Sequence, residues 1–359
     1  MQARFAALPI ALALASACSS ESVVANDAAS TTDAATTDAE TATDAWAAPD
    51  AVEVDASRAD GGLPPGLARY PLEATFPEGG TYDPTGDAFY VGSLGDGSVH
   101  RVSRTTGDET VVFTETAPGT WWSLGMDVDV ARRRLWVCAM DDQRETTSET
   151  PPYAGWIWIF DLDTGMRVAR RDLSRVGVRA TCTDVAVAAD GSAYVTDRES
   201  PRVYHLTETG PVQTLIEDDL LDAAVVGENA IVVLPDQSAL LVLIYLPSRL
   251  VRIDLADGHI ADVAIDGTFG DFTPAASGAD GMTLSGGRLV VALTSEVDVL
   301  TPTLGDWSAA TIASEVDVPA GMTDVIHTPD GDYLLNGQSV RFAFGGSTDP
   351  FALVRFDAP

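Results

Sequence analysis

Three short segments place an oxygen-bearing side chain directly before a run of apolar residues: Glu78 in "PEGG", Asn229 in "ENA" and Asp280 in "ADGM". Considered singly, an aspartate or asparagine at such a place is an ordinary turn residue. If the three meet where water is scarce, their charge needs compensation. A divalent cation would supply it, and calcium is the best match because it binds carboxylate and amide oxygens together with water; magnesium, manganese and zinc are alternatives. A water-filled polar channel without metal is the competing interpretation.

A repeated unit must position these residues. In residues 78–113, apolar alternation is interrupted by "DPTGD", "LGDG" and "TTGD", which predicts four short antiparallel strands joined by tight turns. Further copies begin near residues 125, 182, 229, 280 and 322, a spacing typical of propeller blades and too long for most solenoids. The sequence therefore predicts an all-β, six-bladed β-propeller of four-stranded antiparallel blades.

Strand-like segments flank the repeats, "ARYPLEATF" before the first copy and "FALVRFDAP" after the last. One of them is expected to complete a blade begun at the other terminus, which closes the ring without an open edge. Aligning the copies on their shared turn then gives one column of residues at the start of each first strand: Glu78, Leu124, Thr183, Asn229, Asp280 and Thr323. Because the first strand of a blade borders the central channel, these side chains should ring one mouth of it.

At these residues the sequence resembles the SMP-30/gluconolactonase family, six-bladed propellers that hold one divalent cation in the channel. The family pattern has a glutamate in "EG" at the first blade, an asparagine usually in "NG", and an aspartate in "DG" near the fifth. Glu78, Asn229 and Asp280 match these positions, and the resemblance covers roughly residues 68 to 357. It implies that the three residues are the metal ligands.

Two departures concern the substrate site. Thr183 in "CTDV" stands where family enzymes usually carry a substrate-binding asparagine, and no arginine lies two residues earlier. Arg179 is the nearest arginine and could serve from the preceding loop. The second departure is milder, since alanine in place of glycine follows Asn229.

The resemblance implies a metal-dependent hydrolase of a lactone or related cyclic ester, in which the cation would polarise the carbonyl. Asp280 or Asp184 would accept the proton, and Thr183 and Arg179 would orient the substrate. The alternative is a propeller that binds a small molecule, sugar or protein partner without turnover, because a fold does not determine a function. Whether the protein is an enzyme therefore stays open, and a structural propeller without metal is a third interpretation.

The longest insertion, residues 141–155, joins strands two and three of its blade. Antiparallel geometry places it over the expected metal mouth, as a lid or as a plain surface excursion. By the same geometry seven further side chains could line the rim: Trp121, Trp122, Arg179, Arg198, Tyr245, Arg249 and Phe272.

The N-terminus predicts export. Residues 1–18 contain one early arginine, a short apolar run and small residues before Cys18, as in a secretory signal. The cysteine resembles a bacterial lipoprotein site, so Cys18 is the candidate for lipidation, with plain cleavage as the alternative. Residues 19–62 are rich in Ala, Thr, Ser and Asp and predict a disordered linker. The propeller, residues 63–359, would thus be tethered to a bacterial membrane, in the periplasm or at the cell surface.

The formal net charge of −33 argues against nucleic acid or anionic lipid as a partner, because both require a basic patch. We expect a monomer with a small-molecule substrate or ligand, which contacts the membrane through its lipid anchor only. Cys138 and Cys182 are the other two cysteines, and in an oxidising compartment they could form one disulfide or remain thiols. No CxxC, HExxH or GxSxG motif occurs, so the sequence gives only weak support to zinc-motif, thiol-redox and serine-hydrolase functions.

Overall fold

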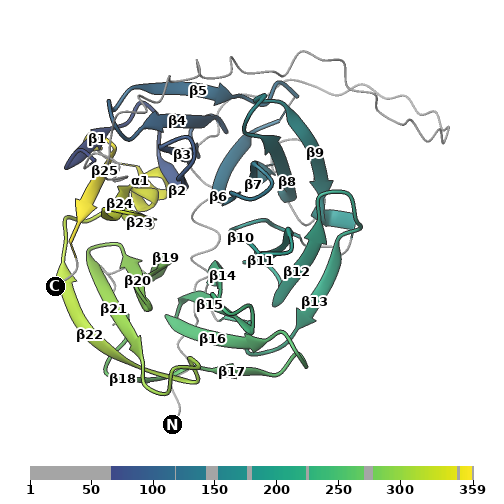
Figure 1. Cartoon of the computed structure of the whole chain (residues 1–359), viewed down its shortest axis with the longest axis vertical. Helices are drawn as coiled ribbons and strands as arrows, with labels where there is room; N and C mark the ends of the chain where they lie inside the picture. Colours follow the sequence, from purple (N-terminus) through teal and green to yellow (C-terminus); the bar gives the residue numbers. More distant parts are fainter. Residues whose placement is uncertain are drawn as a thin grey trace, which may run out of the picture.

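A computed structural model describes residues 66–117, 119–142, 153–175, 180–223, 226–270, 278–345 and 348–357. These residues form six sheets arranged as blades around a central axis (Figure 1). The predicted all-β, six-bladed propeller is therefore confirmed. The signal segment with Cys18, the linker 19–62, most of the 141–155 insertion, Arg179 and Phe272 lie outside the described residues.

The first three blades follow the chain in order, each with its first strand innermost. Blade 1 contains β2 (Pro77–Asp83), β3 (Ala88–Ser93), β4 (Val99–Ser103) and β5 (Glu109–Phe113). Blade 2 contains β6 (Trp121–Asp129), β7 (Arg134–Asp142), β8 (Tyr153–Asp161) and β9 (Arg167–Asp172), followed by the 3-10 helix η2 (Leu173–Arg175). Blade 3 contains β10 (Val185–Val187), β11 (Ser192–Asp197), β12 (Arg202–Thr207) and β13 (Gln213–Glu217).

The last three blades differ from the simple repeat in two ways, because blade 5 has an added fifth strand and blade 6 is completed by the N-terminal strand. Blade 4 contains β14 (Val226–Val233), β15 (Ala239–Leu246), β16 (Arg249–Asp254) and β17 (Ile260–Asp262). Blade 5 contains β19 (Ala279–Ser285), β20 (Arg288–Leu293), β21 (Glu296–Pro302) and β22 (Ala309–Asp317), with β18 (Ala264–Asp266) added in parallel to β22. Blade 6 contains β23 (Met322–Thr328), β24 (Gly331–Asn336), β25 (Ala352–Phe356) and β1 (Arg69–Pro71).

The ring closes between the two ends of the described chain, as predicted. Strand β1 pairs antiparallel with β25, with Tyr70 opposite Leu353, so that purple and yellow strands adjoin in Figure 1. Tyr70 is fully buried and its hydroxyl donates a hydrogen bond of 2.7 Å to the carbonyl oxygen of Arg104 in blade 1. The N-terminal strand therefore joins blade 6 and also packs against blade 1.

The apolar core is divided into six clusters, one at each junction between neighbouring blades. The second strands show why: β3 and β11 are buried at every position, because each blade is covered on both faces by its neighbours. Burial of this apolar surface is the main favourable term in folding. The blades therefore stabilise one another around the whole ring.

Three aspartates of the inner strands connect consecutive blades, namely Asp127, Asp184 and Asp324. In each carboxylate Oδ1 accepts the N–H of the following residue, and Oδ2 accepts a backbone N–H of the next blade. The donors in the next blades are Val187 at 2.8 Å, Ile231 at 2.9 Å and Gly80 at 2.9 Å. These bonds connect the inner strands of blades 2 and 3, 3 and 4, and 6 and 1.

A disulfide joins Cys138 of β7 to Cys182, with 5.1 Å between the two Cα atoms. It connects blade 2 to the segment that enters blade 3, and both residues are fully buried. Of the two states that the sequence left open for this pair, the structure has the bonded one.

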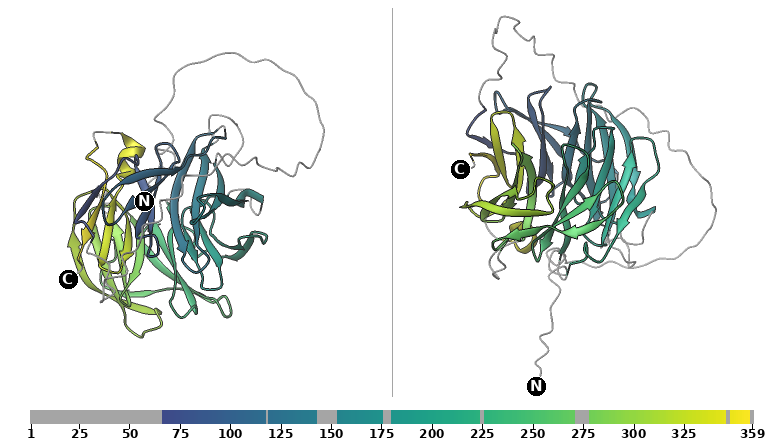
Figure 2. Two further views of the ribbon diagram at one scale, coloured as in Figure 1. Left: turned by 45° about the horizontal axis from the view of Figure 1, so that its top comes forward. Right: turned by 60° about the horizontal axis from the view of Figure 1, so that its bottom comes forward.

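The short helix α1 (Ser339–Phe344) was not expected from the sequence. It lies in the connection between β24 and β25, at one face of the ring (Figure 2). Phe342 of this helix packs against Phe76 and Trp122, with ring centroids 5.2 Å and 5.7 Å away. The helix therefore covers the place where blades 6, 1 and 2 meet. Within the described part of the chain, no helix has the length and apolar character needed to cross a bilayer.

Candidate functional site

Local irregularities of the inner strands aim the candidate ligands at the axis. In five blades the pairing of the first two strands shifts register, between Pro77 and Gly80, Ser123 and Met126, Glu228 and Ile231, Ala279 and Gly281, and Met322 and Asp324. A β-bulge leaves a residue out of the ladder and redirects its side chain. Glu78, Asn229, Asp280 and Thr323 all lie within these shifts, so their side chains leave the alternation of the strand.

Glycine follows Glu78 and Asp280 because the neighbouring inner strand leaves no space there for a side chain. A Cβ atom on Gly281 would lie 2.3 Å from Oδ1 of Asp324, and one on Gly79 would lie 2.6 Å from the Cα of Gly125. Both distances are shorter than any real contact, because the inner strands approach closely at the axis. Ala230, which replaces the glycine after Asn229, is accommodated in a buried position.

The redirected side chains meet in one small cavity of about 20 Å³ on the axis. Five of the six residues of the predicted column line it, and Leu124 does not. Leu124 instead packs in the apolar cluster between blades 2 and 3. The lining residues are Glu78, Gly79, Gly125, Thr183, Asp184, Asn229, Ala230, Asp280, Gly281, Thr323 and Asp324.

Hydrogen bonds fix the orientation of the amide. Asn229 donates from Nδ2 to the backbone oxygen of Asp280 at 2.8 Å and also to Oδ1 of the same residue. Its carbonyl Oδ1 is therefore left as the atom that can bind a ligand. Within the described residues no donor forms a hydrogen bond with Oε2 of Glu78, Oδ2 of Asp280 or the hydroxyl of Thr183.

The electrostatics of the cavity are strongly unbalanced. Burial raises the pKa of Glu78 to about 7 against the opposing charge of Arg198. Burial and the nearby Glu78 raise the pKa of Asp280 well above its ordinary value, and Arg198 again opposes the shift. Burial, Asp280 and Glu78 raise the pKa of Tyr245 as well. Arg198 and Tyr245, two of the predicted rim residues, thus lie within electrostatic reach of both carboxylates.

Asp184 occupies a different position from Asp280. It lines the cavity, but both of its oxygens accept backbone N–H groups and connect blade 3 to blade 4. Burial raises its pKa to about 7 despite these two hydrogen bonds. The two hydrogen bonds of its carboxylate stabilise the backbone of blades 3 and 4. Its assignment as a proton acceptor stays a prediction.

The other rim candidates lie away from the cavity. Trp121 and Trp122 are buried in the clusters on the two sides of blade 2, where Trp121 packs on Trp158 and Trp122 on Phe342. Arg249 forms an ion pair of 2.9 Å with Asp262 at the outer strands of blade 4. Helix α1 is the rim element that sequence reasoning missed, because six residues in a turn-rich connection carry no helical period.

The residues present suit a divalent cation. Two carboxylates and an amide converge, and two of the buried carboxylate oxygens have no hydrogen-bond partner in the described part of the chain. All the donors are hard oxygens of the kind that calcium binds. A cavity of about 20 Å³ has room for a group of the size of a water molecule. A second acidic cluster, Glu296, Asp298 and Glu315, lies elsewhere in blade 5.

No protein-family model and no curated protein matches this sequence. Among solved structures, the allergen Mala s 1 of Malassezia sympodialis is similar with a TM-score of 0.66 and 18% identity over 82% of this chain and 97% of that one. Regucalcin, a calcium-binding protein of Agrobacterium tumefaciens, has a TM-score of 0.54 and 16% identity over 81% and 94%. Virginiamycin B lyase of Staphylococcus aureus has a TM-score of 0.51 and 12% identity over 80% and 98%. At these identities the likeness establishes the propeller fold alone.

Proposed function

We propose that this protein is an SMP-30/gluconolactonase-like hydrolase that acts on a lactone or related cyclic ester and depends on a divalent cation, most simply calcium. One observation carries the proposal. Glu78, Asn229 and Asp280, each from a different blade, line the same cavity, and two of their carboxylate oxygens have no hydrogen-bond partner among the described residues. The calcium-binding name of the structural neighbour regucalcin supports the same choice of ion.

The physical argument concerns the cost of buried charge. An uncompensated carboxylate in a low-dielectric interior either becomes protonated or acquires a cation. Asp184 and Asp324 add two more carboxylates to the lining, and Arg198 is the cation whose charge reaches Glu78 and Asp280. A bound divalent cation would balance this excess and, in the reaction, polarise the carbonyl of the substrate.

The chain's own side chains would bind and orient the substrate. We assign substrate binding to the hydroxyl of Thr183, which lines the cavity, and to Arg198, whose charge acts on Glu78; Arg179 remains a further candidate for it. Asp280 is a better proton acceptor than Asp184, because its Oδ2 accepts no hydrogen bond from the described residues. Helix α1, packed on Phe76 and Trp122, would limit the access of water from one side of the mouth.

A second candidate function is binding of a small molecule, sugar or protein partner without turnover. It is favoured by Thr183, whose side chain is shorter than the asparagine that the resemblance leads one to expect there. A threonine hydroxyl offers one oxygen but lacks the amide group that would hold a substrate in two directions.

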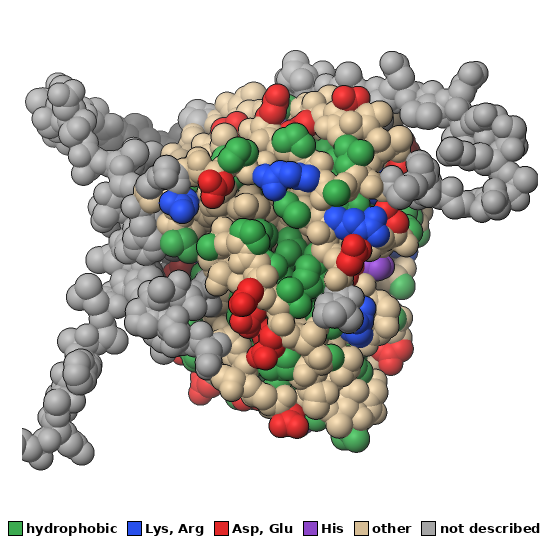
Figure 3. Space-filling view, turned by 90° about the vertical axis from the view of Figure 1, so that its left-hand side faces the viewer, with side chains coloured by type: hydrophobic (Ala, Val, Ile, Leu, Met, Phe, Trp, Pro, Cys, Tyr) green, Lys and Arg blue, Asp and Glu red, His purple; other side chains and the backbone are tan. Residues whose placement is uncertain are grey.

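We further propose that the protein is exported and attached to a membrane through a lipid on Cys18, and that it works as a monomer. The disulfide between Cys138 and Cys182 supports export, since such bonds persist in oxidising compartments. Nucleic acid is not an expected partner. On the side of the ring that carries β1, β22 and β25, arginines are interspersed with acidic side chains and form no basic patch (Figure 3).

The metal assignment is tested by thermal unfolding of the wild type and Asp280→Asn, in chelator and in excess calcium. At 100 times the dissociation constant, one bound ion adds about 2.7 kcal/mol to the free energy of unfolding. The variant should gain less from calcium than the wild type by about this amount. Asp266→Asn removes an exposed charge from the same blade and is the matched control. Equal calcium gains in Asp280→Asn and the wild type would refute the site.

Turnover is tested separately with a panel of lactones. The hydrolase proposal predicts a substrate whose ring opening needs calcium and is slowed at least tenfold in Asp280→Asn. If calcium binds at Asp280 but no lactone is opened, the binding function is the one that stands.

A further inference from the structure

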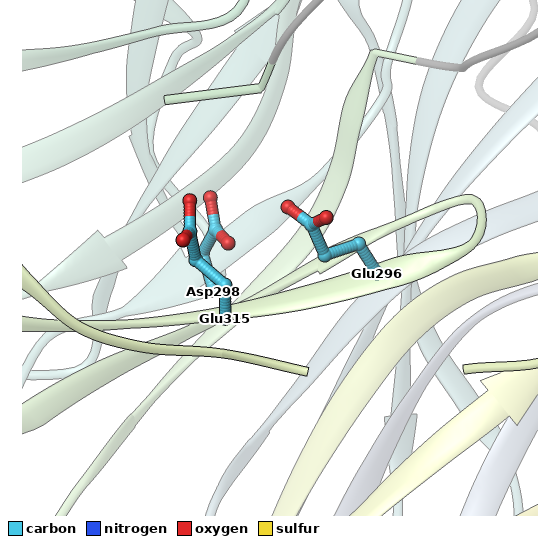
Figure 4. Close-up of side chains that lie close together, drawn as sticks. All are labelled: Glu296, Asp298 and Glu315. Carbon is cyan, nitrogen blue, oxygen red and sulfur yellow. The ribbon is translucent and has the colours of Figure 1, made fainter. Parts of the chain in front are cut away.

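Blade 5 contains a group of three carboxylates that the axial site does not use. Strand β21 pairs with β22 so that Asp298 lies directly opposite Glu315, and Glu296 precedes Asp298 by two residues on the same face. One oxygen from each of the three lies within 4.8 Å of the others. Figure 4 shows Asp298 and Glu315 side by side, with the carboxylate of Glu296 turned toward them. None of the three lines the axial cavity.

Asp298 is the unusual member of this group. It is 0% exposed, and neither of its carboxylate oxygens has a hydrogen-bond partner among the described residues. Its neighbour across the ladder is Val291, which belongs to the apolar cluster between blades 4 and 5. A buried carboxylate therefore lies directly beside an apolar side chain of the core.

The charge around Asp298 is not balanced by protein groups. Within the described residues, no arginine or histidine forms an ion pair with any of the three carboxylates. Burial first, and then Glu296 and Glu315, raise the pKa of Asp298 to about 8. The backbone N–H of Gly270 has a smaller, opposite effect. Like charges directly opposite each other destabilise a pair of strands.

We propose that Glu296, Asp298 and Glu315 form a second divalent-cation site, independent of the axial one, and that calcium is its ligand. The three donors are hard oxygens, which favour calcium or magnesium over softer metals. Bonds of about 2.3–2.6 Å let one calcium ion span oxygens up to about 5 Å apart, whereas magnesium requires a tighter octahedron. The half-buried Glu296 and the exposed Glu315 leave the group accessible from solvent, so that water can complete the coordination.

Binding of calcium at this site would stabilise the pairing of two strands. The ion would join β21 to the outer strand β22 and convert a repulsive cross-strand pair into a bridged one. The same exchange would remove the uncompensated charge from the junction of blades 4 and 5. The site would therefore make the stability of blade 5 depend on calcium.

The test counts bound calcium per chain by equilibrium dialysis of the purified protein, with calcium chloride as the probe. Asp298→Asn should bind one ion fewer than the wild type, whatever the axial site contributes. Asp266→Asn, which removes an exposed charge from β18 of the same sheet, should bind as many as the wild type. Glu315→Gln changes an exposed residue and is the second variant in case Asp298→Asn does not fold.

Thermal unfolding supplies the independent readout. In chelator, Asp298→Asn should be at least as stable as the wild type, because it removes a buried charge. In calcium the order should reverse, since the variant cannot gain from the ion. Unchanged stoichiometry in both variants, or a stability difference that is the same with and without calcium, would overturn the proposal in favour of a proton shared by the carboxylates. If the axial site alone fails to bind calcium, Asp280→Asn will leave the count unchanged, whereas Asp298→Asn will still lower it by one.

Discussion

The disulfide between Cys138 and Cys182 should contribute a large part of the stability of the ring. The perturbation is the double variant Cys138→Ala, Cys182→Ala. The bond joins residues 44 positions apart in the sequence and connects blade 2 to the segment before Thr183. Because both residues are fully buried, alanine fills the sites without placing a polar group in the core.

The magnitude follows from the length of the closed loop. For a separation of 44 residues the loss of chain entropy in the unfolded state corresponds to about 4 kcal/mol at 25 °C. A domain of roughly 290 residues has an unfolding entropy of about 0.6 kcal/mol per degree near its midpoint. The double variant should therefore unfold about 7 °C below the wild type.

The assay is urea unfolding of the oxidised wild type, the reduced wild type and the double variant, followed by tryptophan fluorescence. The variant and the reduced protein should unfold at the same midpoint, well below that of the oxidised protein. A difference below about 1 kcal/mol between oxidised wild type and variant would refute the entropic reasoning. Two titratable thiols in the unreduced, urea-unfolded protein, beyond any at Cys18, would refute the bond itself.

Three further predictions concern the stability of the propeller. Glu115 and Arg167 form a buried ion pair of 2.7 Å, and although burial opposes it, hydrogen bonds and Arg167 lower the pKa of Glu115. Glu115→Gln should lower the free energy of unfolding by about 3 kcal/mol at pH 7. In acid unfolding, this difference between the variant and the wild type should disappear as the pH falls through and below 4.5, where glutamate in the unfolded chain is protonated. Gly125→Ala should lower the midpoint of thermal unfolding by several degrees, because its Cβ would lie 2.1 Å from Oδ1 of Asp184; an unchanged midpoint would contradict this close approach. A chain that begins at residue 72 lacks β1 (Arg69–Pro71) and should lose cooperative unfolding in calorimetry, whereas one that begins at residue 63 should keep it.

Much of the candidate site was predictable because its signals are local. Glu78, Asn229 and Asp280 are followed by a small residue and a strand, and the repeat of this unit placed them in one column. Since each bulge arises within one hairpin, the same local sequence redirects the same side chain in each blade. Leu124 was the exception, because its apolar side chain is more stable in the cluster between blades 2 and 3.

Other features depend on contacts between distant segments and could not be read from the chain. The carboxylate of Asp184 reaches Ile231 in the next blade, so its structural role appears only when blades 3 and 4 are side by side. The charge of Arg198 in blade 3 likewise acts on Glu78 in blade 1, an effect that depends on the arrangement of the blades.

By itself, the sequence determined the number of blades, their strands and the exchange of the terminal strand, because turn residues and period-two alternation act over a few positions. The packing of the blades was needed to see which carboxylates meet and which of their oxygens lack hydrogen-bond partners among the described residues. Asp298 and Glu315 lie on consecutive strands, and it is the register of β21 on β22 that sets them opposite each other. Such meetings depend on the register and packing of whole strands, and these are set by the burial of every apolar side chain in the ring at once.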